Sequence, residues 1–542
     1  MAVDETPDLD GAFPRLTDAQ LATIAAHTEH RPTRVGDLLY REGDPDYDFY
    51  VVAAGTVAIV SDYGTADESV FAVHRRGRFL GELSLITGQA ALFTAVVREP
   101  GEVFVAPAAN LRRLVTQDAG LGDIVLRAFL LRREILIDAG VGLRIVGSRY
   151  SPDTRRLRDL CARNRVPHRW LDLEIDPAAE ELIRRLGVTP EETPVVISAD
   201  RVLRNPTNAE LAEVVGLRHV SGAPSVDLVV VGAGPAGLAA AVYGASEGLS
   251  TVIVDGVAAG GQAATSARIE NYLGFPAGIS GSELAERAVI QAEKFGAKLT
   301  VSAEASALEV KDGEYVVGLD DGTELSARTV VIATGARYRK LDVPRLDEFE
   351  ATSIYYAATQ MEAQMCVGDP VVVVGGGNSA GQAAVFLSRH AVNVHLLIRG
   401  SDLGKDMSRY LVDQVEDNPG VTVLPNTEVR EFVGERGELQ SLVVENNQTR
   451  ERSSLPCRAL FVFIGAEPYT QWLGDAIALD EHGFILTGTA VPEAEREALL
   501  FETNLAGVFA VGDVRCGSIK RVASAVGEGS MAVRLVHEHL AR

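Results

Sequence analysis

Two glycine-rich turns, each following a run of apolar residues, constrain the fold of this chain more than any other feature. The first lies in DLVVVGAGPAGLAAAVYGASEGLSTVIVDG, which starts at Asp227, and the second in PVVVVGGGNSAGQAAVFLSRHAVNVHLLIRG, which starts at Pro370. Each stretch predicts a buried strand, a tight turn, a helix and a second strand. This order is typical of a dinucleotide-binding α/β unit, in which the pyrophosphate lies at the N-terminus of the helix.

The first turn has the three glycines that such a unit requires. Gly232 permits the tight turn, Gly234 lets a pyrophosphate approach the backbone, and Gly237 allows helix and strand to pack closely. Asp255 ends the second strand, where a carboxylate accepts hydrogen bonds from ribose hydroxyls. The predicted site comprises Gly232, Gly234, Pro235, Ala236, Gly237 and Asp255.

The second turn differs from the first at two positions. Ala380 replaces the third glycine, as the motif allows, and Arg399 rather than an acid follows the second strand. An arginine there favours the 2′-phosphate of NADP, although a solvated surface arginine is the alternative. Two such sites indicate a flavin beside a nicotinamide, with a hydride passing between them. The residues predicted to bind NADPH are Gly375, Gly377, Asn378, Ser379, Ala380, Arg399 and Lys405.

Length, charge and cysteine content narrow the possible classes. A chain of 542 residues is long enough for three or four domains. A formal net charge of -24 argues against nucleic-acid binding, which requires a basic face. No apolar run approaches the roughly 18 residues of a membrane span. The cysteines Cys161, Cys366, Cys457 and Cys516 form neither a CxxC pair nor a metal-ligand cluster. We expect a cytoplasmic protein with reduced thiols, no metal site, and neither a membrane nor a nucleic acid as partner.

The amino-terminal part of the chain changes its pattern near residue 140. Residues 1–140 contain short apolar strands separated by glycine turns and then a helical segment, which predicts a β-roll with a helical tail. Residues 141–222 alternate strand and helix in βαβαβ order, which predicts a small α/β domain. The predicted fold class is multidomain: a β-roll plus helices, a small α/β domain and two Rossmann-like α/β domains.

From Val226 to Arg542 the order of motifs resembles that of the low-molecular-weight thioredoxin reductases. The motifs are GAGPAG at 232–237, GGQ at 260–262, IENYLGFP at 269–276, ATG at 333–335, GGGNSA at 375–380, FIGAEP at 463–468 and VGD at 511–513. The resemblance implies an FAD domain of residues 223–340 and 468–542, with an NADPH domain of residues 341–467 inserted into it. It also implies a homodimer.

Carried over position by position, the resemblance places Gln262 and Asn271 beside the flavin and Asp513 at the ribityl chain. Gly335 and Gly465 fall where the family hinges one domain against the other. The further residues implied for FAD are Gly261, Thr334, Gly335, Gly512, Arg521, Val522 and Ala523.

The chain departs from that family at the redox dithiol. The family's CxxC precedes the second glycine turn, and here that place holds Ala357, Ala358, Thr359 and Gln360. We therefore assign no catalytic residue. Cys516 is the remaining candidate, because Arg515 and Lys520 beside it are expected to depress the pKa of its thiol; the alternative is a loop cysteine without a role.

The amino-terminal domains resemble known families that are also altered here. Residues 1–140 resemble a cyclic nucleotide-binding domain, with FLGELSLITG at 79–88 similar to its phosphate-binding cassette and Glu82 placed to hold a ribose hydroxyl. The family's phosphate-pairing arginine falls near Ala91, so we expect a structural or docking role rather than cyclic-nucleotide binding. Residues 141–222 resemble a thioredoxin-like domain, with Thr193-Pro194 at its cis-proline and SRYSPD, which lacks cysteine, at its active-site turn.

The sequence therefore predicts an FAD-dependent oxidoreductase that takes a hydride from NADPH. Without an internal CxxC, its electrons would pass to a partner protein, a quinone-like small acceptor or oxygen. The alternative is a redox or nucleotide sensor that binds FAD and NADPH with little or no turnover.

Overall fold

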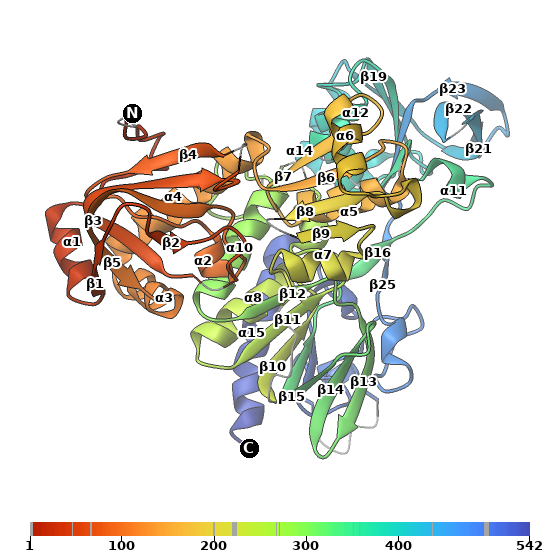
Figure 1. Ribbon diagram of the computed structural model, residues 1–542. Helices are drawn as coiled ribbons and strands as arrows, with labels where there is room; N and C mark the ends of the chain where they lie inside the picture. Colours follow the sequence, from red (N-terminus) through yellow and green to blue (C-terminus); the bar gives the residue numbers. More distant parts are fainter. Residues whose placement is uncertain are drawn as a thin grey trace. The chain divides into compact units, whose positions relative to one another are not determined.

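The computed structural model describes residues 4–542 except for 46, 66–67, 199–200, 219–224, 267, 270, 351, 357, 359, 436 and 493–497. The chain forms two compact units, and Figure 1 labels many of their elements. The first comprises Met1–Val231, Leu238–Ala259 and Arg287–Val330, and the second comprises Gly232–Gly237, Gly260–Glu286 and Val331–Arg542. Among the described helices, none combines the length and the apolar character of a membrane span.

The first unit begins with a β-roll, as the sequence predicts. Its antiparallel sheet has the order β1-β5-β3-β4, with β2 also paired to β5. The strands are β1 (Glu29–Thr33), β2 (Leu38–Tyr40), β3 (Phe49–Ser61), β4 (Ser69–His74) and β5 (Thr94–Ala106). The helices are α1 (Asp18–Ala25), α2 (Ser84–Thr87), α3 (Ala108–Gln117) and α4 (Ala119–Asp138).

Two details of the roll differ from the prediction. The helical tail is two helices, because Asp118 ends α3 and caps α4 by accepting a hydrogen bond from the Leu121 N–H. Strand β1 is not predicted, because its sequence EHRPT is polar and contains Pro32; it forms by pairing with β5 at the edge of the sheet.

A four-stranded sheet follows in the first unit, with the order β7-β6-β8-β9. β6 is parallel to β7 and antiparallel to β8, and β8 is antiparallel to β9. The predicted order of strands and helices is present, and β9 is an additional strand. The Thr193-Pro194 peptide bond is cis. The elements are β6 (Leu143–Gly147), α5 (Pro152–Arg163), β7 (His168–Asp172), α6 (Pro177–Arg185), β8 (Val195–Ser198), β9 (Arg201–Arg204) and α7 (Asn208–Val214).

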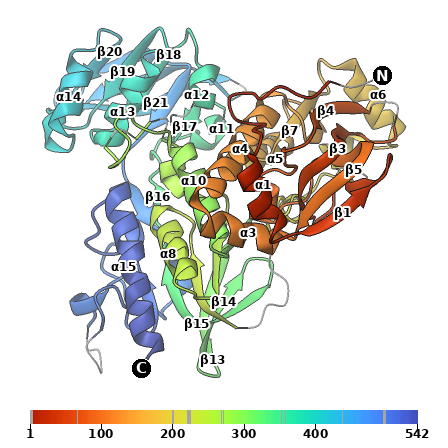
Figure 2. The ribbon, with the colours of Figure 1, turned by 90° about the vertical axis from the view of Figure 1, so that its left-hand side faces the viewer.

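A third sheet carries the strand that precedes the first glycine turn. Its path is β12-β11-β10-β15-β14-β13, parallel from β12 to β10 and antiparallel among β13, β14 and β15. Ile290 of helix α10 belongs to the buried core of the β-roll, so this helix packs on the roll (Figure 2). The elements are β10 (Val226–Val231), α8 (Pro235–Ser246), β11 (Thr251–Asp255), α10 (Gly281–Lys294), β12 (Lys298–Val301), β13 (Ala305–Lys311), β14 (Glu314–Leu319) and β15 (Glu324–Ile332).

In the second unit, a parallel sheet with the order β17-β24-β18-β19-β20 carries the second glycine turn, between β18 and α13. This arrangement is the predicted Rossmann-like unit. The elements are α11 (Leu346–Phe349), β17 (Ile354–Tyr355), α12 (Gln360–Met365), β18 (Pro370–Val374), α13 (Asn378–Leu387), β19 (Asn393–Leu397), α14 (Arg409–Glu416), β20 (Val421–Leu424) and β24 (Ala459–Val462).

A two-stranded ladder lies where the sequence places the hinge. β16 and β25 pair antiparallel, and each begins directly after a predicted hinge glycine. Gly335 has φ of 66° and Gly465 has φ of 103°, in the positive-φ region that favours glycine. The remaining elements of this unit are α9 (Gly261–Ala264), β16 (Ala336–Tyr338), β21 (Thr427–Glu435), β22 (Glu438–Asn446), β23 (Arg452–Pro456), β25 (Ala466–Pro468), β26 (Val508–Ala510) and α15 (Val522–Leu540).

Candidate functional site

The first glycine turn has a backbone that requires glycine at Gly232 and leaves Gly234 open. At Gly232 φ is 103°, and a Cβ there would lie 2.4 Å from the carbonyl oxygen of Ala333. A Cβ at Gly234 would meet no atom within 4 Å. The Gly260 N–H donates a 2.6 Å hydrogen bond to the oxygen of Ala233 and fixes the turn. The turn therefore fits a pyrophosphate that approaches the backbone where α8 begins.

Two other predicted segments lie against this turn. A Cβ at Gly261 would lie 3.1 Å from the Cα of Gly234. Gln262 Nε2 donates a hydrogen bond to the oxygen of Ala336. Thr334 Oγ1 donates a 2.8 Å hydrogen bond to the oxygen of Tyr469. The structure thus gathers the GGQ and ATG segments at the first turn, whereas Asn271 is exposed and makes no hydrogen bond with a described residue.

The residue before Asp513 lies against the same turn. A Cβ at Gly512, which precedes it, would lie 2.9 Å from the Cβ of Ala236 in the first turn. Asp513 is half-buried, burial raises the pKa of its carboxyl group, and no described residue donates a hydrogen bond to it. A carboxylate in this condition fits a hydroxyl donor such as the ribityl chain of FAD.

Helix α15 begins close after that carboxylate. Its N-cap residue, Arg521, makes no side-chain cap, so the first N–H groups of the helix, from Val522 and Ala523, stay available to a ligand. The N-terminus of a 19-residue helix also favours a negative charge. Together with Gly512 and Asp513, these residues fit the polyol and phosphate parts of FAD.

Asp255 lies at the end of β11 in the first unit, as predicted for an acid that binds ribose. Its Oδ1 accepts hydrogen bonds from the N–H groups of Val257, at 2.9 Å, and Ala258, at 3.1 Å. The carboxylate is half-buried and held in one orientation. Its role toward a ribose hydroxyl remains a prediction.

At the second glycine turn, as at the first, a neighbouring segment lies too close to the backbone for a side chain. At Gly375 φ is 145°, and a Cβ there would lie 2.2 Å from the oxygen of Phe463 and 3.1 Å from the Cβ of Ala380. The Asn378 side chain accepts a 2.7 Å hydrogen bond from the Ser408 N–H and thereby joins the start of α13 to the start of α14. Gly377 caps α13 without a side chain, so this helix also has open N–H groups.

The two basic residues predicted to bind the 2′-phosphate are both exposed. Arg399 follows β19 and Lys405 lies in the short turn Leu403–Lys405. Among the described residues, neither has a carboxylate within 4 Å. Both charges are therefore available to a phosphate, which fits the predicted preference for NADPH.

The residues predicted to stand at the place of the family's dithiol, 357–360, include no cysteine. Ala358 is 8% exposed, and Gln360 begins α12, while Ala357 and Thr359 lie outside the described residues. All four cysteines are free. The nearest in sequence, Cys366, is buried at the end of α12, donates to the Glu362 oxygen at 3.2 Å, and has its thiol pKa raised to about 11 by burial. A thiol with so high a pKa is a poor nucleophile.

The expectation of a depressed pKa at Cys516 is wrong. A hydrogen bond with the Asp480 side chain raises the pKa of this thiol. Arg515 does not compensate, because its guanidinium pairs with Glu528 at 2.5 Å, and Lys520 lies over the Phe484 ring. Cys516 therefore has no activated thiolate.

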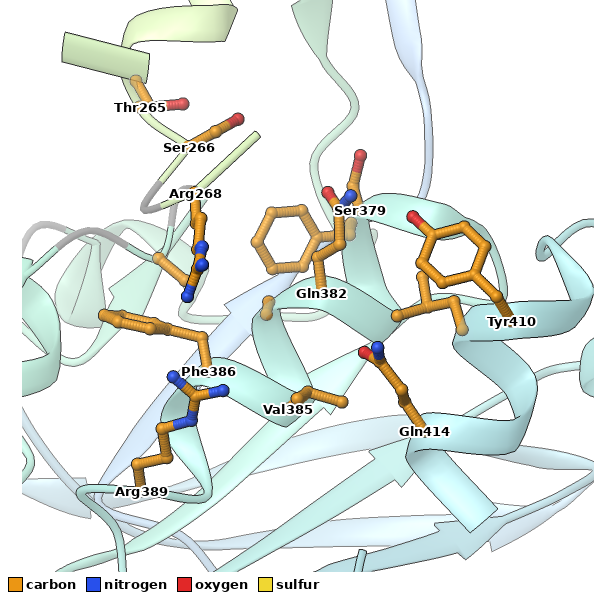
Figure 3. Close-up of a pocket in the computed structure, with 14 residues that line it drawn as sticks. Thr265, Ser266, Arg268, Ser379, Gln382, Val385, Phe386, Arg389, Tyr410 and Gln414 are labelled. Carbon is orange, nitrogen blue, oxygen red and sulfur yellow. The ribbon is translucent and has the colours of Figure 1, made fainter. Parts of the chain in front are cut away.

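A cavity of about 190 Å³ runs along α13 in the second unit (Figure 3). One wall comes from α13 and α14, and another from the segment that follows α9. Ser379 and Ala358 are the predicted residues among its lining. The lining residues are Thr265, Ser266, Arg268, Ala358, Ser379, Gln382, Ala383, Val385, Phe386, Arg389, Tyr410, Leu411, Gln414 and Phe463.

Sequence reasoning missed most of this cavity, although α13 carries a signal for it. Ser379, Gln382, Phe386 and Arg389 follow one another at three- and four-residue spacing, which places them on one face of a helix. This face is polar and aromatic, whereas the opposite face of α13 is buried. The residues from other segments carry no such sequence signal.

The cassette-like segment of the β-roll forms a smaller cavity of about 30 Å³, room for about two water molecules. Glu82 lines it and is 7% exposed, and its Oε2 lies 3.8 Å from Nη2 of Arg133. Arg132 also lines it, but its guanidinium donates to the oxygens of Phe79 and Gly81. Ala91, at the predicted phosphate position, is buried and uncharged.

Comparisons with known proteins agree with these features. Residues 226–529 match the family model described as pyridine nucleotide-disulphide oxidoreductase, and residues 31–118 match the cyclic nucleotide-binding domain. Thioredoxin reductase of Bacillus subtilis (strain 168) is 34% identical over 315 residues, which cover 58% of this chain and 94% of that protein. The 34.2 kDa protein in rubredoxin operon of Clostridium pasteurianum is 32% identical over 315 residues and is covered to 97%, again with 58% of this chain.

Two solved structures show the same fold over this part of the chain. Thioredoxin reductase of T. acidophilum superposes with a TM-score of 0.54 at 30% identity and covers 59% of this chain and 99% of its own. Thioredoxin reductase of Lactococcus lactis, in its FR conformation, superposes with a TM-score of 0.53 at 28% identity and covers 58% and 99%.

Proposed function

Because the chain belongs to the pyridine nucleotide-disulphide oxidoreductase family, we propose that it is an FAD-dependent oxidoreductase that oxidises NADPH and passes the electrons to an acceptor outside its own chain. One observation carries the second half of this proposal. All four cysteines are free, three of them are buried, and the place predicted for the family's dithiol includes Ala358 and no cysteine. No internal disulfide can therefore take the electrons.

The residues around the two glycine turns support the choice of cofactors. The open backbone at Gly234 and the half-buried carboxylate of Asp513 suit FAD, which supplies two-electron chemistry when bound. Arg399 and Lys405 suit the 2′-phosphate of NADPH. The chain's own part is to bind and orient the two rings and to exclude water, and the glycines at 335 and 465 suit a hinge between the two domains.

The proposal extends to the domains that precede the flavin domain. The sheet order β7-β6-β8-β9 supports a thioredoxin-like domain, and its predicted active-site turn, SRYSPD, contains no cysteine. We also propose a homodimer, which the resemblance to thioredoxin reductases implies and which sedimentation equilibrium would test.

Anaerobic mixing with NADPH tests the core of the proposal. The flavin absorption at about 450 nm should bleach on the order of seconds or faster, because typical enzymes turn over at this rate. Dithionite serves as the control that the flavin is reducible. Persistence of the absorption for minutes with NADPH, but not with dithionite, would leave a protein that only binds the two cofactors, such as a sensor.

Replacement of Cys516 by serine should leave turnover unchanged within about twofold. A hydrogen bond with Asp480 raises the pKa of the thiol, so Cys516 is a poor nucleophile. Its replacement therefore removes no reactive group. Steady-state oxidation of NADPH with a quinone acceptor and with a small disulfide measures the effect. Loss of disulfide reduction in this variant would instead assign Cys516 a redox role.

A further inference from the structure

The cavity beside α13 differs in charge from the chain as a whole. The chain has a formal net charge of -24, yet none of the fourteen described residues that line the cavity is acidic. Two of them, Arg268 and Arg389, are basic. In Figure 3 both guanidinium groups point into the same end of the cavity, beside the ring of Phe386. This end of the cavity therefore favours a negative charge.

Arg389 supplies a charge that the protein does not neutralise. The residue is exposed, and no described carboxylate lies within 4 Å of its guanidinium. It lies just after the last residue of α13, Leu387. The N-terminal end of the same helix carries Ser379 of the second glycine turn, where the pyrophosphate of NADPH is proposed to bind. The arginine end is thus separated from the nucleotide end by the length of the helix.

The rest of the lining suits a flat ring. Phe386, Phe463 and Tyr410 contribute aromatic faces, and Gln382 and Gln414 contribute carboxamides that can donate hydrogen bonds. The volume of about 190 Å³ suits a ring system, since a cavity of about 150 Å³ admits benzene. Aromatic walls with a few polar donors are typical of small-molecule sites.

The position of the cavity connects it to electron transfer. Thr265 and Ser266 follow α9, which carries Gln262 at the proposed flavin site, and Ala358 stands where the family has its dithiol. We propose that this cavity binds the small electron acceptor, a quinone-type aromatic molecule with an anionic substituent that Arg389 pairs. The proposal rests on the proposed function and names the acceptor's chemical class.

The reaction balances without a further reagent. NADPH is oxidised to NADP⁺, and the quinone gains two electrons and two protons, one from the hydride of NADPH and one from solvent. The products are NADP⁺ and the hydroquinone. No cysteine takes part.

A charge reversal at Arg389 tests the site. We expect Arg389→Glu to raise the KM for 1,4-naphthoquinone-2-sulfonate at least tenfold, about 1.4 kcal/mol of binding. The KM for uncharged 1,4-naphthoquinone should change less than twofold. Arg184→Glu is the matched control, because Arg184 is an exposed arginine on α6 that pairs with Glu180. A second variant, Gln382→Glu, should act in the same direction as Arg389→Glu.

Equilibrium dialysis of the oxidised protein with the sulfonate gives a readout that does not depend on turnover. Binding should weaken at least tenfold in Arg389→Glu and should persist with saturating NADP⁺. Equal KM values for the sulfonate in the wild type and in both variants would overturn the proposal, and so would displacement of the sulfonate by NADP⁺. If NADPH fails to bleach the flavin while the sulfonate still binds through Arg389, the proposed function fails and the anion site stands.

Discussion

Replacing Arg133 with methionine is expected to lower the free energy of unfolding of the β-roll by about 3–5 kcal/mol, the usual effect of removing one partner from a buried charge cluster. Arg133 is 2% exposed, and its Nη2 lies 3.8 Å from Glu82 Oε2 and donates to Gln89 Oε1 at 3.0 Å. Its positive charge also acts on Glu293 of α10, which is buried with one carboxylate oxygen unpartnered. Without Arg133, two buried carboxylates would depend mainly on Arg112 and Arg132.

This cost should depend on pH with a definite sign. Burial raises the pKa of both Glu82 and Glu293 above the ordinary value of a glutamate. An acid whose folded-state pKa is raised destabilises the fold progressively as pH rises through its unfolded-state pKa. Arg133 offsets this penalty, so the loss in Arg133→Met should be larger at pH 8 than at pH 5.

Urea denaturation of the full chain, followed by far-UV circular dichroism, measures the change. Arg127→Met is the matched control, since Arg127 is an exposed arginine on the same helix, and its effect should stay within about 0.5 kcal/mol. Adding Glu293→Gln to Arg133→Met should recover part of the loss, because it removes one uncompensated charge. If Arg133→Met unfolds at the same urea concentration as the wild type, the cluster does not stabilise the roll.

The charge cluster around Arg133 also involves residues outside the N-terminal domain. Glu82 and Gln89 come from the cassette-like segment, Arg133 from α4, and Glu293 from a helix of the predicted flavin domain. Arg133 also donates to the oxygen of Arg165 in the middle domain, at 3.3 Å. Arg133 thus interacts with segments that the sequence assigns to three domains, through hydrogen bonds to two of them and through its charge on the third. The structural or docking role of the β-roll stays a prediction.

The parts of the fold that depend on neighbours in sequence could be predicted. The apolar runs before the turns at Gly232 and Gly375 form β10 and β18, because a continuous apolar run with a glycine turn leaves few alternatives to a buried strand. β9 could not be predicted in this way. Its sequence RVLR is mostly exposed, and it forms by pairing with β8.

Only part of the candidate site could be predicted from the sequence. Gly512 and the GGQ and ATG segments lie at the first turn, and their motifs indicated this because the order of motifs resembles that of a known family. The pKa of Cys516 depends on Asp480, and the cavity brings Arg268 to the end of α13. These contacts join segments far apart in the chain, and no local pattern encodes them.

Replacing Gly375 with valine is expected to abolish bleaching by NADPH while FAD stays bound. The backbone at Gly375 has φ of 145°, and a Cβ there would lie 2.2 Å from the oxygen of Phe463. A β-branched residue cannot adopt this conformation without shifting the turn, so the open N–H groups at the start of α13 would move away from the pyrophosphate. We expect the Kd for NADPH to rise at least about 100-fold, which corresponds to about 2.7 kcal/mol.

Flavin content and anaerobic titration separate this effect from misfolding. The Gly375→Val protein should keep its FAD and bleach with dithionite, since the first turn at Gly232 is untouched. Gly400→Ala is the matched control in the same domain, because a Cβ at Gly400 meets no atom within 4 Å, and it should bleach with NADPH like the wild type. If Gly375→Val keeps the NADPH dependence of the wild type, the nucleotide must bind elsewhere than at the second turn. In that case NADPH would not bind at the start of α13. The proposed division of the cavity into a nucleotide end and an acceptor end would then be wrong.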